Sequence, residues 1–196
     1  MRRRFAIPLG LLLAVLALRV SAQEALVVTP LAEKKVRELP DSELFWRIEN
    51  FTTASEARAA AGQWSLVAES ENKVWLFTLG ASGGSTPGAR KVAEVGPIPR
   101  PEASEFLLRI NQATGPPGSI TPVHTHPGSE AFFVLSGEQT VRNTHKTIQV
   151  KAGEAEPGCG ADIPMQVSSS GSADLHALVM FVVDATKPFA PPAKFP

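Results

Sequence analysis

The sequence predicts a mostly β protein, folded as an antiparallel sandwich or barrel, with one or two short helices near its beginning. Short segments that are apolar, or that alternate between apolar and polar residues, are separated by glycine, proline, serine or asparagine about every 8 to 12 residues. With 17 prolines and 15 glycines in 196 residues, the chain has more turn signals than a helical bundle needs. This length favours a single domain that buries a core of its own.

The composition excludes several classes of function. The chain has 19 basic and 19 acidic residues, so it lacks the basic excess expected of a nucleic-acid-binding protein. Its single cysteine, Cys159, can form neither an internal disulfide nor a multi-cysteine zinc site. We therefore expect no nucleic-acid partner and no stabilisation by cysteine crosslinks.

The first residues, Met1 to Ala22, have the pattern of a secretory signal peptide. Arg2-Arg3-Arg4 supply a positive start, Ile7 to Leu18 are nearly all apolar, and small residues surround the expected cleavage point. A transmembrane anchor is the alternative, but the apolar run is about 12 residues long and a spanning helix needs about 20. The sequence thus predicts an exported protein, periplasmic or secreted, without a membrane span after signal cleavage.

The segment 23–104 is predicted to be an N-terminal extension of short helices and added strands, with a role in forming a homodimer as the alternative. Helical turns are expected over Ala32 to Glu38, and a longer helix over Thr53 to Ala61, where Thr53 can cap the first turn. Its tryptophans and phenylalanines are interpreted as core residues, with a pocket lining as the alternative. A two-residue period then predicts a pair of strands, Trp64 to Ala68 and Lys73 to Leu79.

Residues 105–186 are predicted to form one β-barrel domain, followed by a surface tail, 187–196, that contains four prolines. The last strand is apolar at odd and even positions alike, so it should be central in its sheet. The strand candidates are Glu105 to Asn111, Ser119 to His126, Ala131 to Leu135, Glu138 to Arg142, Thr147 to Val150, Met165 to Ser168 and Leu175 to Val183.

The segment from His124 to Glu130 contains residue types that commonly bind metals. His124 and His126 are two residues apart, so on an extended strand both imidazoles leave the same face. Pro127-Gly128-Ser129 can turn the chain, and Glu130 then begins the next strand beside them. Two imidazoles and one carboxylate form a three-ligand set for a divalent metal, similar to the arrangement that leaves open positions on non-haem iron. The alternative is that both histidines are ordinary exposed loop residues.

Residues 118–137 resemble the first signature of the cupin family, G-x5-H-x-H-x3-E-x6-G, at every specified position. The resemblance implies a cupin-type jelly-roll β-barrel in which His124, His126 and Glu130 are metal ligands. It implies a divalent transition metal (Fe, Mn, Cu, Zn or Ni) without selecting one. It does not select a reaction either, because the family includes dioxygenases, isomerases, decarboxylases, lyases and non-catalytic binders.

The second cupin signature, G-x5-P-x-G-x2-H-x3-N, is degenerate in this chain, and Met165 stands where a fourth ligand, a histidine, is usual. Three interpretations stay open: the Met165 thioether is a weak ligand that favours a softer metal such as copper, water completes a three-ligand site, or Met165 fills core space. His176 is a candidate substitute ligand or proton shuttle. His145 is expected in an exposed turn, and Cys159 in a loop near the barrel mouth.

Two functions follow from these residues. The first is an exported metal-binding cupin that acts as a metal-dependent oxygenase or isomerase on a small organic molecule, with Glu130 as a base if it leaves the metal. The second is a non-catalytic cupin that binds a small molecule or a metal. The complete first signature favours a retained metal, and the degenerate second signature favours binding without turnover.

Overall fold

The structure, a computed structural model, describes residues 24–196, so the predicted signal segment 1–22 lies outside the described residues. Within this range the chain forms twelve strands and one helix, which confirms the mostly β fold. The elements are β1 (Val27–Val36), β2 (Leu44–Phe51), α1 (Ala54–Ala60), β3 (Ser65–Ser70), β4 (Lys73–Gly80), β5 (Arg90–Ile98), β6 (Phe106–Gly115), β7 (Gly128–Ser136), β8 (Glu138–Asn143), β9 (Thr147–Lys151), β10 (Ala155–Pro157), β11 (Met165–Ser169) and β12 (Leu175–Asp184).

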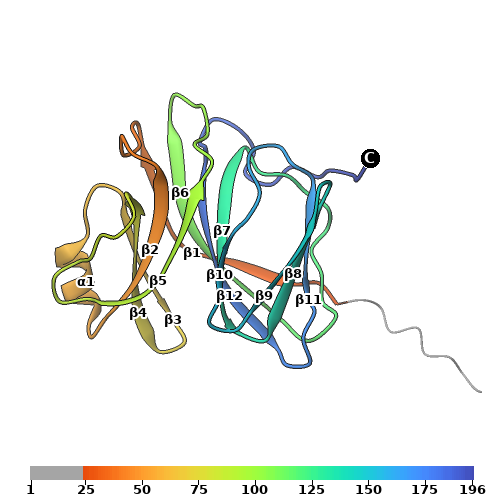
Figure 1. Cartoon of the computed structure of the whole chain (residues 1–196), viewed down its shortest axis with the longest axis horizontal. Helices are drawn as coiled ribbons and strands as arrows, with labels where there is room; N and C mark the ends of the chain where they lie inside the picture. Colours follow the sequence, from red (N-terminus) through yellow and green to blue (C-terminus); the bar gives the residue numbers. More distant parts are fainter. Residues whose placement is uncertain (1–23) are drawn as a thin grey trace, which may run out of the picture.

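Three sheets are stacked in layers (Figure 1). The middle layer is a five-stranded sheet in the order β1-β6-β12-β7-β10. A three-stranded sheet, β11-β8-β9, closes one side of it to form the barrel, and a four-stranded sheet, β3-β4-β2-β5, covers the other side. The N-terminal extension therefore contributes one strand to the barrel sheet and one complete outer layer.

Both faces of the middle sheet are buried, which explains why β12 is apolar at odd and even positions alike from Ala177 to Val183. Even-numbered residues of β12, such as Leu178, Met180 and Val182, pack in the core shared with the four-stranded sheet. Odd-numbered residues, such as Val179 and Phe181, pack in the barrel core. β12 lies at the centre of the sheet, as its sequence predicts.

The tryptophans of the extension belong to this core. Trp46 and Trp75 are buried between the four-stranded sheet and the middle sheet, and Trp75 contacts Phe77 and Phe133 with ring centroids 6.3 and 6.2 Å apart. The interpretation of the aromatic residues as core is confirmed for these side chains. Their burial joins the extension to the barrel.

The helix α1 begins and ends close to the expected positions. Its N-cap Thr53 accepts a hydrogen bond from the Glu56 backbone, and the Glu56 carboxylate accepts one from the Thr53 backbone, which completes a capping box. The expectation of helical turns over Ala32 to Glu38 is wrong, because this segment lies mainly within β1. There it pairs with β6 over nearly its whole length, and this ladder outweighs the local helix propensity of its polar residues.

The predicted strand over Ser119 to His126 is also wrong as a regular strand. Within the described residues only isolated bridges form, from Ile120 to Ala25 and Ser168 and from His124 to Met165 and Pro192. Pro122 within the segment has no N–H to donate, so a continuous ladder cannot form. The segment nevertheless stays extended along β11, because the His124 and Met165 backbones exchange two hydrogen bonds of 3.0 and 2.9 Å.

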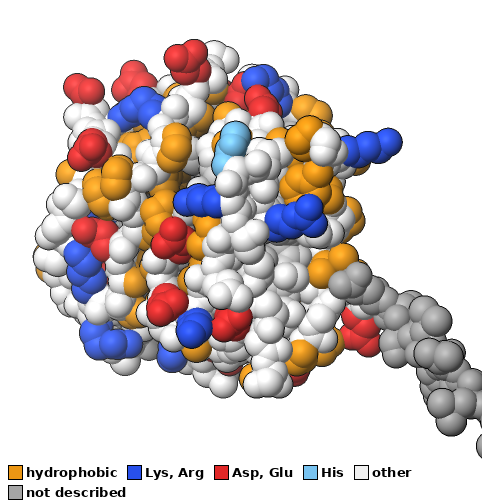
Figure 2. All heavy atoms as spheres, turned by 45° about the vertical axis from the view of Figure 1, so that its right-hand side comes forward, with side chains coloured by type: hydrophobic (Ala, Val, Ile, Leu, Met, Phe, Trp, Pro, Cys, Tyr) orange, Lys and Arg blue, Asp and Glu red, His pale blue; other side chains and the backbone are white. Residues whose placement is uncertain are grey.

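Acidic and basic side chains are interspersed on the face of the molecule shown in Figure 2, with no large patch of one sign. In the part of the chain that the structure covers, the single helix is too short to cross a lipid bilayer.

Candidate metal and ligand site

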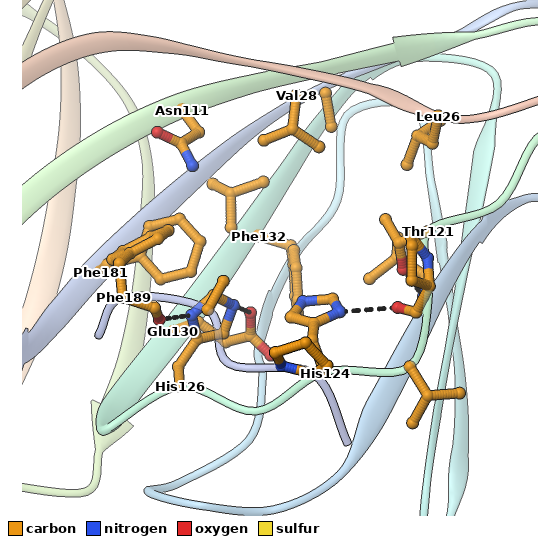
Figure 3. A pocket seen from close by; sticks show the side chains of 17 residues that line it. Leu26, Val28, Asn111, Thr121, His124, His126, Glu130, Phe132, Phe181 and Phe189 are labelled. Carbon is orange, nitrogen blue, oxygen red and sulfur yellow. Dashed lines mark hydrogen bonds and ion pairs between the residues drawn. The ribbon is translucent and has the colours of Figure 1, made fainter. Parts of the chain in front are cut away.

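A cavity of about 400 Å³ opens at the mouth of the barrel, between the two barrel sheets (Figure 3). Its walls come from β1, β6, β7 and β12 of the middle sheet, from β11 of the three-stranded sheet, from the bridging segment around His124, and from the C-terminal tail. Most of the lining is aliphatic or aromatic. The polar side chains that reach it are those of Asn111, Thr121, His124, His126 and Glu130.

Each histidine is held by a backbone carbonyl. His124 Nδ1 lies 2.8 Å from the Pro122 carbonyl oxygen, and His126 Nδ1 lies 2.7 Å from that of Phe189. A carbonyl oxygen only accepts, so both Nδ1 atoms carry the proton and both Nε2 atoms keep a lone pair. Metal-binding histidines are commonly oriented in this way. The two rings are neighbours, with centroids 4.9 Å apart and planes at 83°.

Glu130 projects from β7 into the floor of the cavity and is almost fully buried. Its Oε2 lies 3.8 Å from His126 Nε2, which is too long for a hydrogen bond, and its Oε1 has no partner among the described residues. Gly158 makes room for it, because a Cβ there would lie 2.5 Å from Glu130 Cγ. The chain thus buries a carboxyl group in a mostly apolar environment and leaves its Oε1 without a partner among the described residues.

Burial is the main cause of the shifted pKa values of Glu130 and His126. Burial raises the pKa of Glu130 to about 8, although the backbone around Cys159 opposes the shift. Burial also lowers the pKa of His126 to about 4, against the effect of its bond to the Phe189 carbonyl. At neutral pH, without a cation beside them, the two groups are therefore neutral neighbours rather than an ion pair.

The types of donor fit a divalent transition metal. Two imidazoles with free Nε2 lone pairs and one buried carboxylate oxygen without a partner are the ligands such an ion prefers. Within residues 24–196, however, no group of three or more His, Cys, Asp or Glu side chains converges closely enough to hold an ion. The structure brings His126 and Glu130 face to face and places His124 beside them.

Met165 does not reach the cavity. It is fully buried in the barrel core, and it is absent from the residues that line the cavity. What it contributes to the site is its backbone, which holds that of His124. This placement favours the interpretation of Met165 as a core residue over the thioether ligand.

The other sequence candidates lie outside the cavity lining. His176 Nδ1 is 2.7 Å from Glu71 Oε1 and its Nε2 is 3.3 Å from Ser70 Oγ, so it joins β12 to the β3–β4 turn. Cys159 is buried next to Glu130, and its Sγ accepts a hydrogen bond of 3.2 Å from Asn143. His145 is exposed in the turn that Asn143 caps.

Sequence reasoning missed the C-terminal contribution. The tail is not simply a surface segment, because Phe189, Ala190 and Pro192 line the cavity. Asn111 and Thr121 were also missed. The available signal was Phe189 between Pro188 and Pro191, since a large aromatic side chain in a proline-rich tail tends to pack against the folded domain.

A barrel of two sheets with a His-x-His pair and a glutamate at its mouth is the arrangement of the cupin fold. A family model described as Cupin domain matches residues 112–156, which include all three candidate ligands. The chain therefore contains a cupin domain. No curated protein matches the chain.

Solved structures similar to this chain include other cupins. A cupin-like protein from Thermotoga maritima is 16% identical, with 45% of this chain and 65% of that chain covered at a TM-score of 0.40. A cupin family protein with a double-stranded β-helix fold from Methanocaldococcus jannaschii is 20% identical (43% and 71% covered, TM-score 0.35). A putative sugar phosphate isomerase from Acidithiobacillus ferrooxidans is 25% identical (37% and 48% covered, TM-score 0.33).

Proposed function

We propose that the protein binds a divalent transition metal through His124, His126 and Glu130, in a pocket that also takes a small organic molecule. The observation that carries this proposal is the buried Glu130 carboxyl, whose Oε1 has no partner among the described residues. Burying such a group without a partner destabilises a fold, so its presence calls for a function. A cation held between Glu130 and the two Nε2 lone pairs would remove that cost.

In this proposal the protein is a metal-dependent oxygenase or isomerase. A bound metal would supply Lewis acidity to a ligand oxygen. The walls of the pocket are mostly apolar, and the two carbonyl-bound histidines present their Nε2 atoms in a fixed tautomer. Glu130 would be ionised while it holds the metal, and on leaving it would accept a proton from the ligand, because burial raises the pKa of this carboxyl to about 8 and so favours its protonated form.

The second candidate is a cupin that binds its ligand without turning it over. It is favoured by the cavity lining, in which the three proposed ligands are the only acid or base groups among the residues from 24 onward. We also propose that the protein is exported to the periplasm or secreted, on the pattern of Met1 to Ala22.

Elemental analysis of the chain expressed without residues 1–22 tests the proposal. We expect close to one metal ion per chain in the wild type and a near-complete loss in a His124→Ala/His126→Ala variant. Met165→Ala is the matched control, and it should keep its metal because the thioether lies outside the cavity. Metal lost from folded Met165→Ala would make the thioether a ligand. No metal in the reconstituted wild type would refute metal binding and leave the second candidate.

A further inference from the structure

The C-terminal segment 189–193 lies across the mouth of the cavity (Figure 3). Two backbone hydrogen bonds tie it to the segment that carries the histidines. Thr125 N donates to the Pro191 carbonyl at 3.1 Å, and Ala193 N donates to the Val123 carbonyl at 3.0 Å. The segment is therefore part of the wall of the cavity, attached on both sides of His124.

Phe189 makes two kinds of contact within this wall. Its carbonyl accepts the hydrogen bond from His126 Nδ1, and its ring lies 4.8 Å from the His126 ring and 4.9 Å from the Phe181 ring. The Arg109 guanidinium lies over the Phe189 ring, 4.4 Å from its centroid. Phe189 is thus a positioning residue for His126 and an aromatic surface for whatever enters the cavity.

Asn111 faces the same space from β6. Arg109 Nε donates to Asn111 Oδ1 at 2.9 Å, and since a guanidinium can only donate, this bond fixes which end of the amide is the oxygen. The Asn111 Nδ2 group then turns toward the cavity (Figure 3). Because Asn111 is almost fully buried, this donor requires an acceptor from the ligand or from water in the cavity.

The rest of the lining argues against strongly polar ligands. No lysine or arginine is among the described residues that line the cavity, so no basic side chain of the lining would neutralise a phosphate. The Thr121 Oγ1 accepts a hydrogen bond from Val167 N at 3.0 Å, so one of its lone pairs is engaged and its O–H is left to donate. The walls therefore offer few partners to a sugar, whose hydroxyl groups would lose their water without replacement.

We propose that the cavity selects an aromatic compound of one or two rings that carries an acceptor oxygen, packed against the contacting Phe189 and Phe181 rings with the oxygen facing Asn111 Nδ2. A cavity of about 400 Å³ is large enough for a molecule of this size. The proposal deepens the proposed function by naming its ligand class. It rests on that function only in assuming that the cavity is a ligand site, because none of these contacts needs the metal.

Calorimetric titration with acetophenone as the aromatic probe and ribose 5-phosphate as the polar probe tests this selection. Metal-free and metal-loaded protein are both titrated. We expect acetophenone to bind both forms, and ribose 5-phosphate to bind either at least tenfold more weakly. Equal or tighter binding of ribose 5-phosphate, or no binding of acetophenone, would overturn the proposal. Metal content is measured on the same samples, so a failure of metal binding is seen separately from a failure of ligand selection.

Three variants assign the contacts. Phe189→Ala should weaken acetophenone binding about tenfold through loss of the aromatic wall. Asn111→Asp keeps the oxygen that Arg109 needs but removes the donor, and should weaken binding by a similar factor. Phe195→Ala is the matched control, because this ring of the same tail packs on Arg142, 4.6 Å away, outside the cavity. Unchanged affinity in both test variants, or an equal loss in Phe195→Ala, would contradict the assignment.

Discussion

The outer sheet and the barrel each bury one glutamate, and the chain treats the two carboxylates in opposite ways. Glu49, on β2, accepts hydrogen bonds from the Thr86 backbone N–H at 2.8 Å and the Thr86 hydroxyl at 2.6 Å, and Arg47 Nε lies 3.1 Å from it. Glu130, on β7, receives no hydrogen bond at Oε1, and its Oε2 faces a neutral imidazole 3.8 Å away. Both residues are buried to a similar degree.

The hydrogen-bond partners of Glu49 and Glu130 differ, and this difference explains why their pKa values are shifted in opposite directions. Burial raises the pKa of Glu49, but the bonds from Thr86 and the Arg47 guanidinium outweigh it, so the pKa lies below its ordinary value. Burial alone dominates at Glu130 and raises its pKa to about 8. Glu49 in the outer sheet shows that this chain can supply hydrogen-bond donors and a positive charge to a buried, ionised carboxylate. The incomplete surroundings of Glu130 therefore indicate a group kept for a ligand or metal rather than for stability.

The largest expected effect is that of replacing Glu49 on the free energy of unfolding. Glu49→Ala removes the partner of a largely buried guanidinium and of the Thr86 N–H, and should lower the free energy of unfolding by about 3 kcal/mol. Urea denaturation of the metal-free protein measures it. Glu105→Ala is a suitable control, since its salt bridge with Lys35 is exposed and should contribute less than about 1 kcal/mol. Equal losses of unfolding free energy in the two variants would contradict the structural role given to Glu49.

The next effect concerns His126, whose orientation depends on the tail. Ending the chain after Thr186 removes the carbonyl that holds His126 Nδ1, and should weaken metal binding by about 10- to 100-fold. Competition with a metal-sensitive dye gives the affinity, and circular dichroism shows whether the barrel stays folded. A chain that ends after Ala193 keeps Phe189 and should bind as the wild type does. Unchanged affinity in a folded chain ending after Thr186 would show that the tail does not position His126.

Replacing Glu130 should have the opposite sign to replacing Glu49. Glu130→Gln keeps the shape but removes the group that must be buried as a neutral acid or as an unpaired charge, so metal-free protein should become more stable by about 1–2 kcal/mol at pH 8. The same variant should lose its metal. Thermal unfolding with and without added metal measures both. A destabilised metal-free variant would place Glu130 among the structural residues.

The smallest effect is a pair of opposite pH dependences in metal-free protein. The pKa of Glu49 is lowered below 4.5 by folding, so its stabilising contribution is present above pH 4.5 and is lost as the pH falls through the folded value. The pKa of Glu130 is raised from 4.5 to about 8, so stability is lost as the pH rises across that range. Glu49→Gln should flatten the acid side of the stability profile, and Glu130→Gln the neutral side. A profile that neither substitution alters would contradict both assignments.

The sequence predicts the elements whose local pattern agrees with their tertiary surroundings. The capping box at Thr53 defines α1, and β12 was expected at the centre of its sheet because it has no polar face. The helix expected over Ala32 to Glu38 is wrong because pairing with β6 is non-local and leaves no mark in a polar sequence. Local propensity was correct only where no distant strand competed for the same backbone.

The candidate site residues also fall into those that local spacing predicts and those that depend on non-local contacts. The spacing of His124, His126 and Glu130 is local, and the structure places all three on one cavity. The roles of Phe189 and Asn111 could not be predicted, because they depend on where the tail returns and on which end of an amide Arg109 holds. Met165 shows the limit of alignment to a motif, since its position matches a usual ligand while its side chain packs in the core.

The central claim is that the barrel holds its metal with two imidazoles and the Glu130 carboxylate. X-ray absorption spectroscopy of the zinc-loaded protein tests it most directly. We expect nitrogen and oxygen neighbours at about 2.0–2.1 Å, including two imidazoles, with no sulfur near about 2.3 Å. A sulfur neighbour would bring Met165 or Cys159 to the metal, and a spectrum without imidazole would place the metal outside the cavity; either result would contradict the account.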